Sequence, residues 1–284
     1  MKHGWLPILA LIGLAALLGL LAWLAPGSDA VTAPVLSATP PAQVRAITLE
    51  RPGQPTIELE RRDAQWRIKA PLSARADEFQ VQRMLALLEA KPDARLPATD
   101  LDRFDLLSPA ARLTIDGAEY AFGGINTVTR EQYVMRGDTV YVLALRHGAA
   151  LPASAVTLIR RVLLEEHEIP EAILLQEFRV RQSAGRWTID PADAAAGADE
   201  LQQFIERWRF ASAARAEPHD GRPALAEIRV ELREGAPLAI SVLQREPQLV
   251  LLRQDQGLQY TFLAGAGEAL LAYPGKSAST KNNQ

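Results

Sequence analysis

Hydrophobic residues are distributed differently in different parts of this chain, and each pattern predicts its own kind of segment. Residues 5–25 form an almost unbroken apolar run without a charged side chain, and Trp5 and Trp23 stand near its ends. About 20 apolar helical residues span the roughly 30 Å hydrocarbon core of a bilayer. The pattern predicts a transmembrane helix that contacts the lipid bilayer, with both tryptophans at the membrane–water interfaces.

The flanks of this run predict its orientation. Lys2 precedes the run, and no Lys or Arg follows it until Arg45. Since basic flanks stay in the cytoplasm, we expect residues 1–4 inside and the main domain outside. A cleaved signal peptide is the alternative, because Ser28 and Ala30 are small residues suited to cleavage. Its apolar core is normally about 7–15 residues, which is shorter than this run.

The segments at the two ends of the remaining chain lack hydrophobic periodicity. Residues 26–43 are rich in Pro, Ala, Ser and Thr, which predicts a semi-extended linker. Residues 274–284 are polar and are predicted to form a disordered tail. The folded part is therefore expected between these two segments.

A two-residue alternation of apolar and polar side chains begins after the linker. It predicts antiparallel strands with one buried face, and Trp66 and Ile68 continue it beyond a tight turn. Asp77 is a candidate N-cap for the helix that follows. The apolar face of that helix has i, i+3, i+4, i+7 spacing and consists of Val81, Met84, Leu85 and Leu88.

The second half of the chain repeats this order. Trp187 and Ile189 match Trp66 and Ile68 at an offset of 121 residues (187 − 66), and residues 198–200 repeat the Ala-Asp-Glu of residues 76–78. The next helix has the same apolar spacing, in Leu201, Phe204, Ile205 and Trp208. These matches predict a tandem duplication with modules at residues 44–165 and 170–273, and with Trp66 and Trp187 both largely buried.

The remaining elements complete an α+β prediction. Each half continues into further strand candidates, centred on Thr114, Ala121, Val134 and Tyr141 in the first half and on Val230, Ile240, Val250 and Tyr260 in the second. Residues 173–181 are interpreted as one strand, and residues 152–164 as a helix that closes the first module. The fold class is therefore one transmembrane helix followed by two related modules of antiparallel strands, with one or two helices each.

Composition excludes several kinds of site. The chain has no cysteine, so disulfides, thiolate catalysis and thiolate metal sites are excluded. The net charge of −3 comes from 31 basic and 34 acidic residues without a basic block, so nucleic acid is not an expected partner. No nucleophile elbow, phosphate loop or dinucleotide fingerprint occurs. Gly123-Gly124 is interpreted as a bend at a strand end, and residues 265–267 as a loop.

Polar clusters offer little evidence for chemistry. His167 lies between two glutamates and is a candidate metal ligand, but a solvated residue at a helix end is the simpler interpretation. His147 is expected to be exposed at a strand end. Asp100, Asp102 and Asp105 lack the glycine and the terminal glutamate of a calcium loop, and capping of a short helical turn is favoured. We therefore predict no catalytic, metal or cofactor-binding residue and no cofactor.

Aromatic residues give one further expectation. Trp66, Trp187 and Trp208 lie at core positions of amphipathic elements, so burial is favoured over exposure for sugar stacking. Residues 208–210 are three consecutive bulky side chains, of which at least one must point away from the core. Phe210 is therefore a possible partner surface if it is exposed.

Ordered motifs in the first module resemble a known family. They are Trp66-Arg67-Ile68 with Pro71, Ala76-Asp77, residues 101–109 (LDRFDLLSP), Phe122-Gly123, Gln132-Tyr133-Val134 and residues 137–141 (GDTVY). Their order resembles the bacterial domain of unknown function 4340, well over residues 44–165 and more weakly beyond. Relatives commonly show an aromatic-glycine pair where this chain has Phe104-Asp105. The resemblance implies a bacterial, membrane-anchored protein facing away from the cytoplasm, often encoded near gliding-motility-type ABC transporter components. It transfers no catalytic residue.

The expected function follows from these points. The leading hypothesis is a non-enzymatic, membrane-tethered interaction module, an accessory subunit of an ABC-type transport or envelope assembly. It would be single-pass in the bacterial inner membrane, with the N-terminus cytoplasmic, the main domain periplasmic and membrane proteins as partners. A tethered binding protein for an envelope glycan or lipid, using a cleft between the modules, is the alternative. An uncharacterised membrane-anchored hydrolase is the third hypothesis.

Overall fold

A computed structural model describes residues 36–275 of the chain. The apolar run at residues 5–25, with Trp5 and Trp23, lies outside the described residues, as do the preceding residues 1–4 and the tail from residue 276. Within residues 36–275, every helix is too short or too polar to cross a bilayer.

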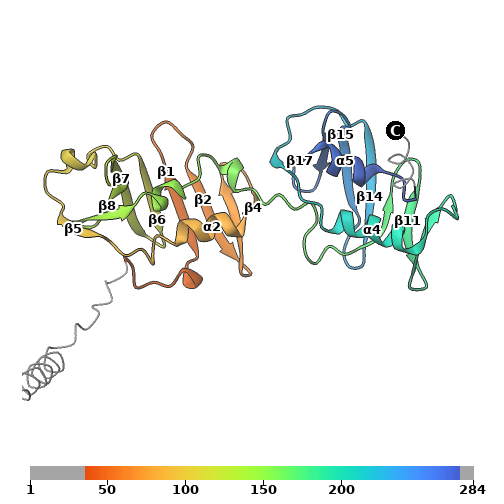
Figure 1. The fold of residues 1–284 in the computed structure, drawn as a ribbon, viewed down its shortest axis with the longest axis horizontal. Coiled ribbons are helices and arrows are strands. Elements are labelled where there is room, and N and C mark those ends of the chain that lie inside the picture. Colours follow the sequence, from red (N-terminus) through yellow and green to blue (C-terminus); the bar gives the residue numbers. More distant parts are fainter. Residues whose placement is uncertain (1–35, 276–284) are drawn as a thin grey trace, which may run out of the picture.

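Two antiparallel sheets account for most of the described chain (Figure 1). The first has the strand order β4-β3-β2-β1-β6-β7-β8-β9-β5, and the second β12-β11-β10-β14-β15-β16-β17-β13. The strands of the first are β1 (Ala46–Glu50), β2 (Ile57–Arg62), β3 (Gln65–Ala70), β4 (Ala74–Arg75), β5 (Ala94–Pro97), β6 (Ala111–Ile115), β7 (Ala118–Asn126), β8 (Glu131–Arg136) and β9 (Thr139–Ala144). Those of the second are β10 (Pro170–Leu174), β11 (Arg179–Ser183), β12 (Arg186–Asp190), β13 (Arg215–Pro218), β14 (Ala226–Leu232), β15 (Leu238–Gln244), β16 (Leu249–Arg253) and β17 (Leu258–Phe262). The fold is thus α+β in type but mostly β.

The two sheets share one topology, apart from the additional strand β4 in the first. In each, three consecutive strands form a meander, a helix follows, and one strand crosses to the far edge beside the last strand of a four-stranded meander. The register also agrees, since Trp66 pairs with Arg61 and Trp187 with Gln182, both at an offset of 121 residues (187 − 66 and 182 − 61). We call the two units the first and second modules.

The matching tryptophans differ in burial. Trp66 is 1% exposed, as expected, whereas Trp187 is only half-buried and its indole Nε1 donates to Oε1 of Gln202 at 2.7 Å. Both point to the helix-covered face of their sheet, because each shares a strand face with a buried isoleucine, Ile68 or Ile189. The repeat therefore preserves the position of the side chain but not the depth of its burial.

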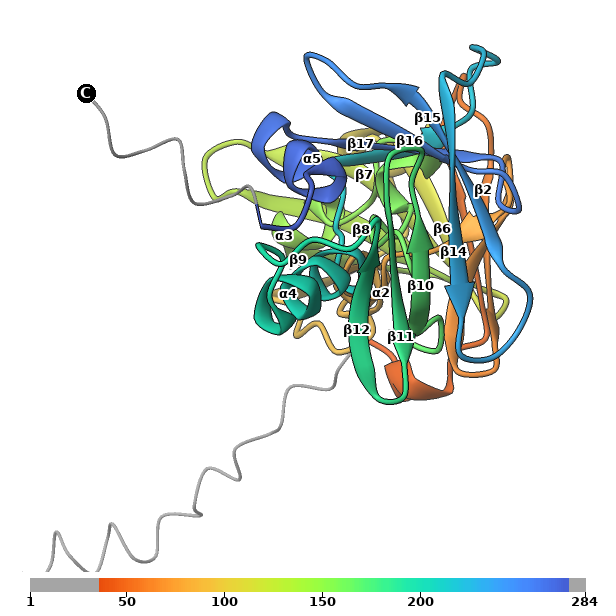
Figure 2. The same cartoon turned by 90° about the vertical axis from the view of Figure 1, so that its right-hand side faces the viewer.

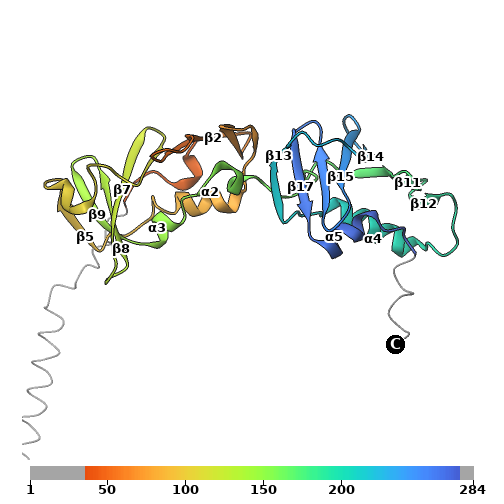
Figure 3. The ribbon, with the colours of Figure 1, turned by 90° about the horizontal axis from the view of Figure 1, so that it is seen from above.

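Helices cover one face of both sheets, as seen from above in Figure 3. Helix α2 (Glu78–Leu85) begins after Asp77, whose carboxylate accepts from the backbone N–H of Gln80 as the predicted N-cap. Helix α4 (Ala198–Arg209) is longer, and Nε1 of Trp208 donates to the carbonyl of Leu270 in α5 (Ala264–Leu271). All eight residues expected on the apolar faces of the two helices are buried.

Two predicted elements are wrong. Residues 173–181 are not one strand but parts of the hairpin β10–β11. Of the predicted helix at residues 152–164, only a 3-10 turn, η3 (Ala155–Leu158), is present. The chain after it is extended, because its backbone bonds to both modules: the N–H of Arg160 donates to Arg75 and that of Leu163 to Ala211. The helical spacing of its apolar residues instead reflects burial between the modules.

Three local expectations also need correction. Gly123-Gly124 is not at a strand end but inside β7, at a register shift where Gly123 packs against the Phe104 carbonyl and the Leu106 side chain. Residues 265–267 lie in helix α5 rather than in a loop. His147, expected to be exposed, is buried in the short helix α3 (Arg146–Ala149). The close approach at Gly123 depends on residues far along the chain, which local sequence patterns do not encode.

Part of the predicted linker packs on the first module. Leu36 is 3% exposed, and its N–H donates to the carbonyl of Ala90, while the N–H of Ser37 donates to that of Leu88. A short 3-10 turn, η1 (Pro41–Gln43), leads into β1. At the other end, Pro274 at the start of the predicted tail is buried. The packed chain therefore extends a few residues beyond the expected bounds of both modules.

Candidate functional site

The junction between the modules is the most elaborate polar arrangement in the described chain. The segment of residues 152–169, which we call the connector, lies between the edge of the first sheet and the second module. It forms antiparallel bridges to both sides, Ala76 with Ile159 and Val162 with Ser212. The N–H of Asp77 also donates to Leu158 at 2.7 Å. The connector is therefore bonded to both modules through its backbone.

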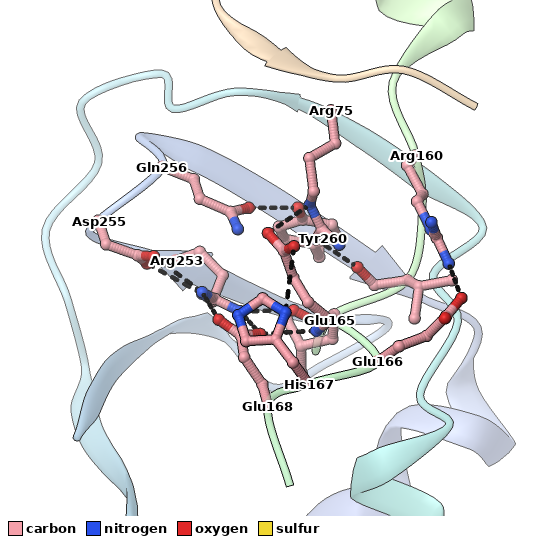
Figure 4. A network of polar contacts seen from close by, with 12 residues as sticks. Arg75, Arg160, Glu165, Glu166, His167, Glu168, Arg253, Asp255, Gln256 and Tyr260 are labelled. Carbon is pink, nitrogen blue, oxygen red and sulfur yellow. Dashed lines mark hydrogen bonds and ion pairs between the residues drawn. The ribbon is translucent and has the colours of Figure 1, made fainter. Parts of the chain in front are cut away.

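Arg75 of β4 fixes the connector from the first module (Figure 4). Its side chain is almost completely buried, and its Nε lies 3.2 Å from Oε1 of Glu165. Nη2 of the same guanidinium donates to the carbonyl of Val162 at 2.9 Å. A charge that is removed from water in this way is tolerated only when it is paired and hydrogen-bonded, so Arg75 and Glu165 depend on each other.

Arg253, the last residue of β16, fixes the connector from the second module. Its two Nη atoms donate to both carboxylate oxygens of Glu168, at 2.8 and 2.9 Å, and Nη1 donates to the carbonyl of Leu163 at 2.7 Å. Its Nε and Nη2 donate to Asp255, at 2.9 and 2.8 Å. Five hydrogen bonds match the five N–H groups of a guanidinium. The fully buried Arg253 therefore has no donor left for a ligand.

Charge and burial shift the titration of these groups. Burial opposes ionisation of Glu168, but the hydrogen bonds and the positive charge of Arg253 outweigh it and lower the pKa of Glu168. Hydrogen bonds from Arg253 likewise lower the pKa of Asp255, and burial raises the pKa of Tyr260. Both carboxylates are thus held ionised by a partner that never releases its proton. That arrangement suits a structural ion pair better than a proton-transfer group.

His167 lies at the surface of this network. Its Nδ1 is 3.8 Å from Oε2 of Glu165, and its side chain is 74% exposed. In residues 36–275, no three histidine or acidic side chains gather closely enough to hold a metal ion. The aspartates at residues 100–105 belong to the 3-10 turn η2 (Leu101–Phe104), where Asp100 makes no side-chain cap bond.

Two clefts flank the connector. One of about 600 Å³ is lined by Phe79, Arg160, Glu166 and Ser212, among others. The other, about 440 Å³, is lined by Gln80, Thr157 and residues 214–217. Asp77 and Arg161 line both clefts. The walls carry both signs of charge, so neither cleft presents a field that would select a ligand by charge alone.

Exposed aromatic side chains lie close to this junction. Phe210 directly follows helix α4 and is 68% exposed, which meets the condition set for a partner surface, and Arg209 lies over its ring at 5.3 Å. The next residue, Ala211, bonds to the connector. Phe79, in the first turn of α2, is 69% exposed and was not singled out from the sequence. Sequence reasoning also did not single out Arg253. Its place on the apolar face of β16, in line with Leu249 and Leu251, could have indicated a buried charge.

Comparison with known proteins gives one match. The family described as a domain of unknown function (DUF4340) matches residues 66–219, more than half of the chain. The matched region runs from β3 through the connector to the end of β13, so it includes Arg75, Glu165 and Glu168. Neither the curated proteins nor the solved structures contain a match.

The position at which the chain departs from the expected motif has a physical explanation. Asp105 adopts the left-handed conformation, with φ of 53°. Glycine adopts this conformation without steric cost, and aspartate is one of the few other residues that tolerate it. Asp105 is therefore compatible with the glycine that the family resemblance led us to expect at this position.

Proposed function

This chain belongs to the DUF4340 family, and from that premise we propose that it is a non-enzymatic, membrane-tethered interaction module, an accessory subunit of an ABC-type transport or envelope assembly. In this proposal residues 5–25 anchor it in the bacterial inner membrane and both modules lie in the periplasm. The family is defined by a domain rather than by an activity, so the proposal rests on the junction and on the exposed surface.

The complete hydrogen bonding of the Arg253 guanidinium is the main observation behind this proposal. All five of its N–H groups are bonded to the connector or to Asp255, so the charges of Arg253, Glu168 and Asp255 neutralise one another instead of facing a substrate. A network of this kind fixes two modules relative to each other. A fixed two-module body suits a subunit that holds a partner at a set distance from the membrane.

Phe210 supports a partner surface. Its side chain is mostly exposed, and aromatic residues are enriched where proteins bind each other. It directly follows a helix whose large apolar residues are buried, namely Leu201, Phe204, Ile205 and Trp208. We therefore assign the partner contact to the α4 end that faces the junction.

A matched pair of variants tests the partner contact. Tagged full-length protein would be purified from mildly solubilised membranes, as wild type, Phe210→Asp and Phe79→Asp. The two side chains are equally exposed, at 68% and 69%, so neither change should unfold the protein. We expect ABC-transporter components with the wild type and with Phe79→Asp, and their loss with Phe210→Asp. Equal recovery with all three proteins would contradict the assignment.

A reporter fusion tests the membrane topology. Because Lys2 precedes the apolar run and no basic residue follows it before Arg45, alkaline phosphatase fused after Gln284 should be active. A cytoplasmic reporter at the same position should be inactive. The reverse pair of results would place both modules in the cytoplasm. Intact mass of the extracted protein separately distinguishes a retained anchor from a cleaved signal peptide.

The second candidate function is binding of an envelope glycan or lipid in a cleft between the modules. It is favoured by the 600 Å³ cleft, which combines the exposed Phe79 ring with Arg160 and Arg161. Phe79→Asp should then abolish ligand binding while Phe210→Asp leaves it unchanged. The same two variants therefore separate the two functions.

A further inference from the structure

The two modules differ in how they finish one edge of their sheets. In the first, β3 is covered by β4, and the carbonyl of Trp66 accepts from the N–H of Ala76 at 2.9 Å. In the second, the corresponding strand β12 pairs only with β11, and no described segment takes the place of β4. Figure 2 faces this end of the molecule and shows β12 in the foreground.

The backbone groups on this open edge can be identified from the turn that precedes β12. Ala184 and Gly185 form a two-residue hairpin turn with φ of 49° and 77°, so Ser183 and Arg186 are a hydrogen-bonded pair. Because hydrogen-bonded and non-hydrogen-bonded pairs alternate, the backbone N–H and C=O of Trp187 and Ile189 point away from β11. Their counterparts in the first module include the Trp66 carbonyl, which accepts from Ala76 directly after β4.

The sequence of β12 is complementary to itself. If two copies pair antiparallel about Thr188, Arg186 of each lies opposite Asp190 of the other, and Trp187 lies opposite Ile189. The outward backbone groups then form the hydrogen-bonded pairs, and the two Thr188 residues meet at the two-fold axis. Arg186 is exposed without a side-chain partner in residues 36–275, and Arg179 engages only Oδ2 of Asp190. The opposite charges therefore remain available for cross-strand pairs.

From this complementarity we propose that the open edge of β12 binds β12 of a second copy of the chain. The two second modules then share one continuous antiparallel sheet, with an interface in which each copy presents the same surface. The other outer edge of the molecule, β5, is a poorer candidate because Pro97 in that strand cannot donate a hydrogen bond. The proposal does not depend on the membrane anchor or on the transporter partner.

A cysteine scan of the cysteine-free chain tests this pairing. Non-hydrogen-bonded pairs place Cα atoms about 4.5 Å apart, within the roughly 4.4–6.8 Å that a disulfide requires. Full-length Thr188→Cys should therefore form a disulfide-linked dimer under mild oxidation. Arg67→Cys is the matched control, since Arg67 is also exposed, at the equivalent position of β3, but its edge is covered by β4. We expect about ten times less cross-linking from it, because its Cα atoms cannot approach within disulfide reach.

Exchanging the charges at residues 186 and 190 tests whether cross-linking depends on this register or arises from chance collision. In the Thr188→Cys background, Arg186→Glu alone places Glu opposite Asp190, and Asp190→Arg alone places Arg opposite Arg186, so each should cross-link poorly with itself. A mixture of the two chains restores both opposite-charge pairs and should cross-link as the heterodimer. The proposal is overturned if Thr188→Cys gives no more dimer than Arg67→Cys, if the mixture shows no gain, or if the cysteine captures a different protein.

Discussion

Both modules carry an arginine at the same position of the fold, but the two arginines make different numbers of charged contacts. Arg136 and Arg253 each end the third strand of a four-stranded meander, and each donates to the carbonyl of a leucine that precedes its module, Leu36 or Leu163. Arg136 otherwise stacks over Tyr120 at 5.5 Å, whereas Arg253 also binds two carboxylates. The duplicated fold therefore kept one backbone contact and built the junction network upon it.

The same comparison clarifies the role of the connector. Leu36 and Leu163 also donate their N–H groups to equivalent positions behind the module helices, Ala90 and Ala211. Residues 36–43 therefore relate to the first module as the connector relates to the second. A segment that holds one module to the preceding chain in the first case holds two modules together in the second.

The largest difference is expected between the two arginines. Arg253→Met leaves Glu168 buried without its partner, so the free energy of unfolding should fall by about 3–5 kcal/mol, the usual cost of breaking a buried ion pair. Arg136→Met removes one charged hydrogen bond and a cation–π contact and should cost about 1–2 kcal/mol. Urea unfolding of the full-length protein measures both. Equal losses would show that the junction network adds nothing to the shared contact.

The tryptophans should show the next largest difference. Trp66→Ala removes a fully buried side chain and should destabilise by about 3–5 kcal/mol. Trp187→Ala should cost roughly half as much, because the half-buried ring loses less apolar area. The same unfolding measurement applies, with Arg67→Ala as an exposed control that should change little. A larger effect at Trp187 than at Trp66 would contradict the burial seen here.

As the pH falls, the contribution of His147 to stability should be lost before that of Glu168 at the junction. Burial, helped by the charge of Arg146, lowers the pKa of His147 from 6.5, so the folded state binds that proton less well than the unfolded state. The stabilisation is present above pH 6.5 and is lost as the pH falls through the folded value. Glu168 also has a pKa lowered from its ordinary 4.5, so its contribution is lost only at lower pH. His147→Gln should remove part of the pH dependence of the unfolding free energy below pH 6.5, and Glu168→Gln should do so only below pH 4.5, as measured by unfolding at each pH.

Two glycine-to-alanine changes in the closing helix α5 should have effects of opposite sign. Helix α5 is longer than its counterpart α3 and packs closely on β16, since a Cβ added at Gly267 would lie 2.5 Å from Cβ of Leu249. Gly267→Ala should destabilise by about 1–3 kcal/mol. Gly265→Ala meets no atom within 4 Å and should stabilise by about 0.5–1 kcal/mol through helix propensity. Thermal unfolding of the pair would show both signs, and two stabilising changes would argue against close packing.

Short-range patterns in the sequence determined much of the repeat. The two-residue period around Trp66 and Trp187, the Asp77 cap and the two apolar helix faces predicted elements that the structure contains, because each depends on neighbours within one strand pair or one helical turn. The same reasoning required at least one of the three bulky residues 208–210 to point away from the core, and both Arg209 and Phe210 do so.

Only the tertiary structure decided how these elements are joined. Residues 152–164 have helical spacing but are mostly extended, because their backbone groups find partners on both modules, and Arg253 is buried because a carbonyl and two carboxylates converge on it from distant positions. The open edge of β12 likewise exists only because no strand equivalent to β4 follows it. Local periodicity reports which face of an element is buried, but hydrogen-bond partners far along the chain are fixed only when the sheets assemble.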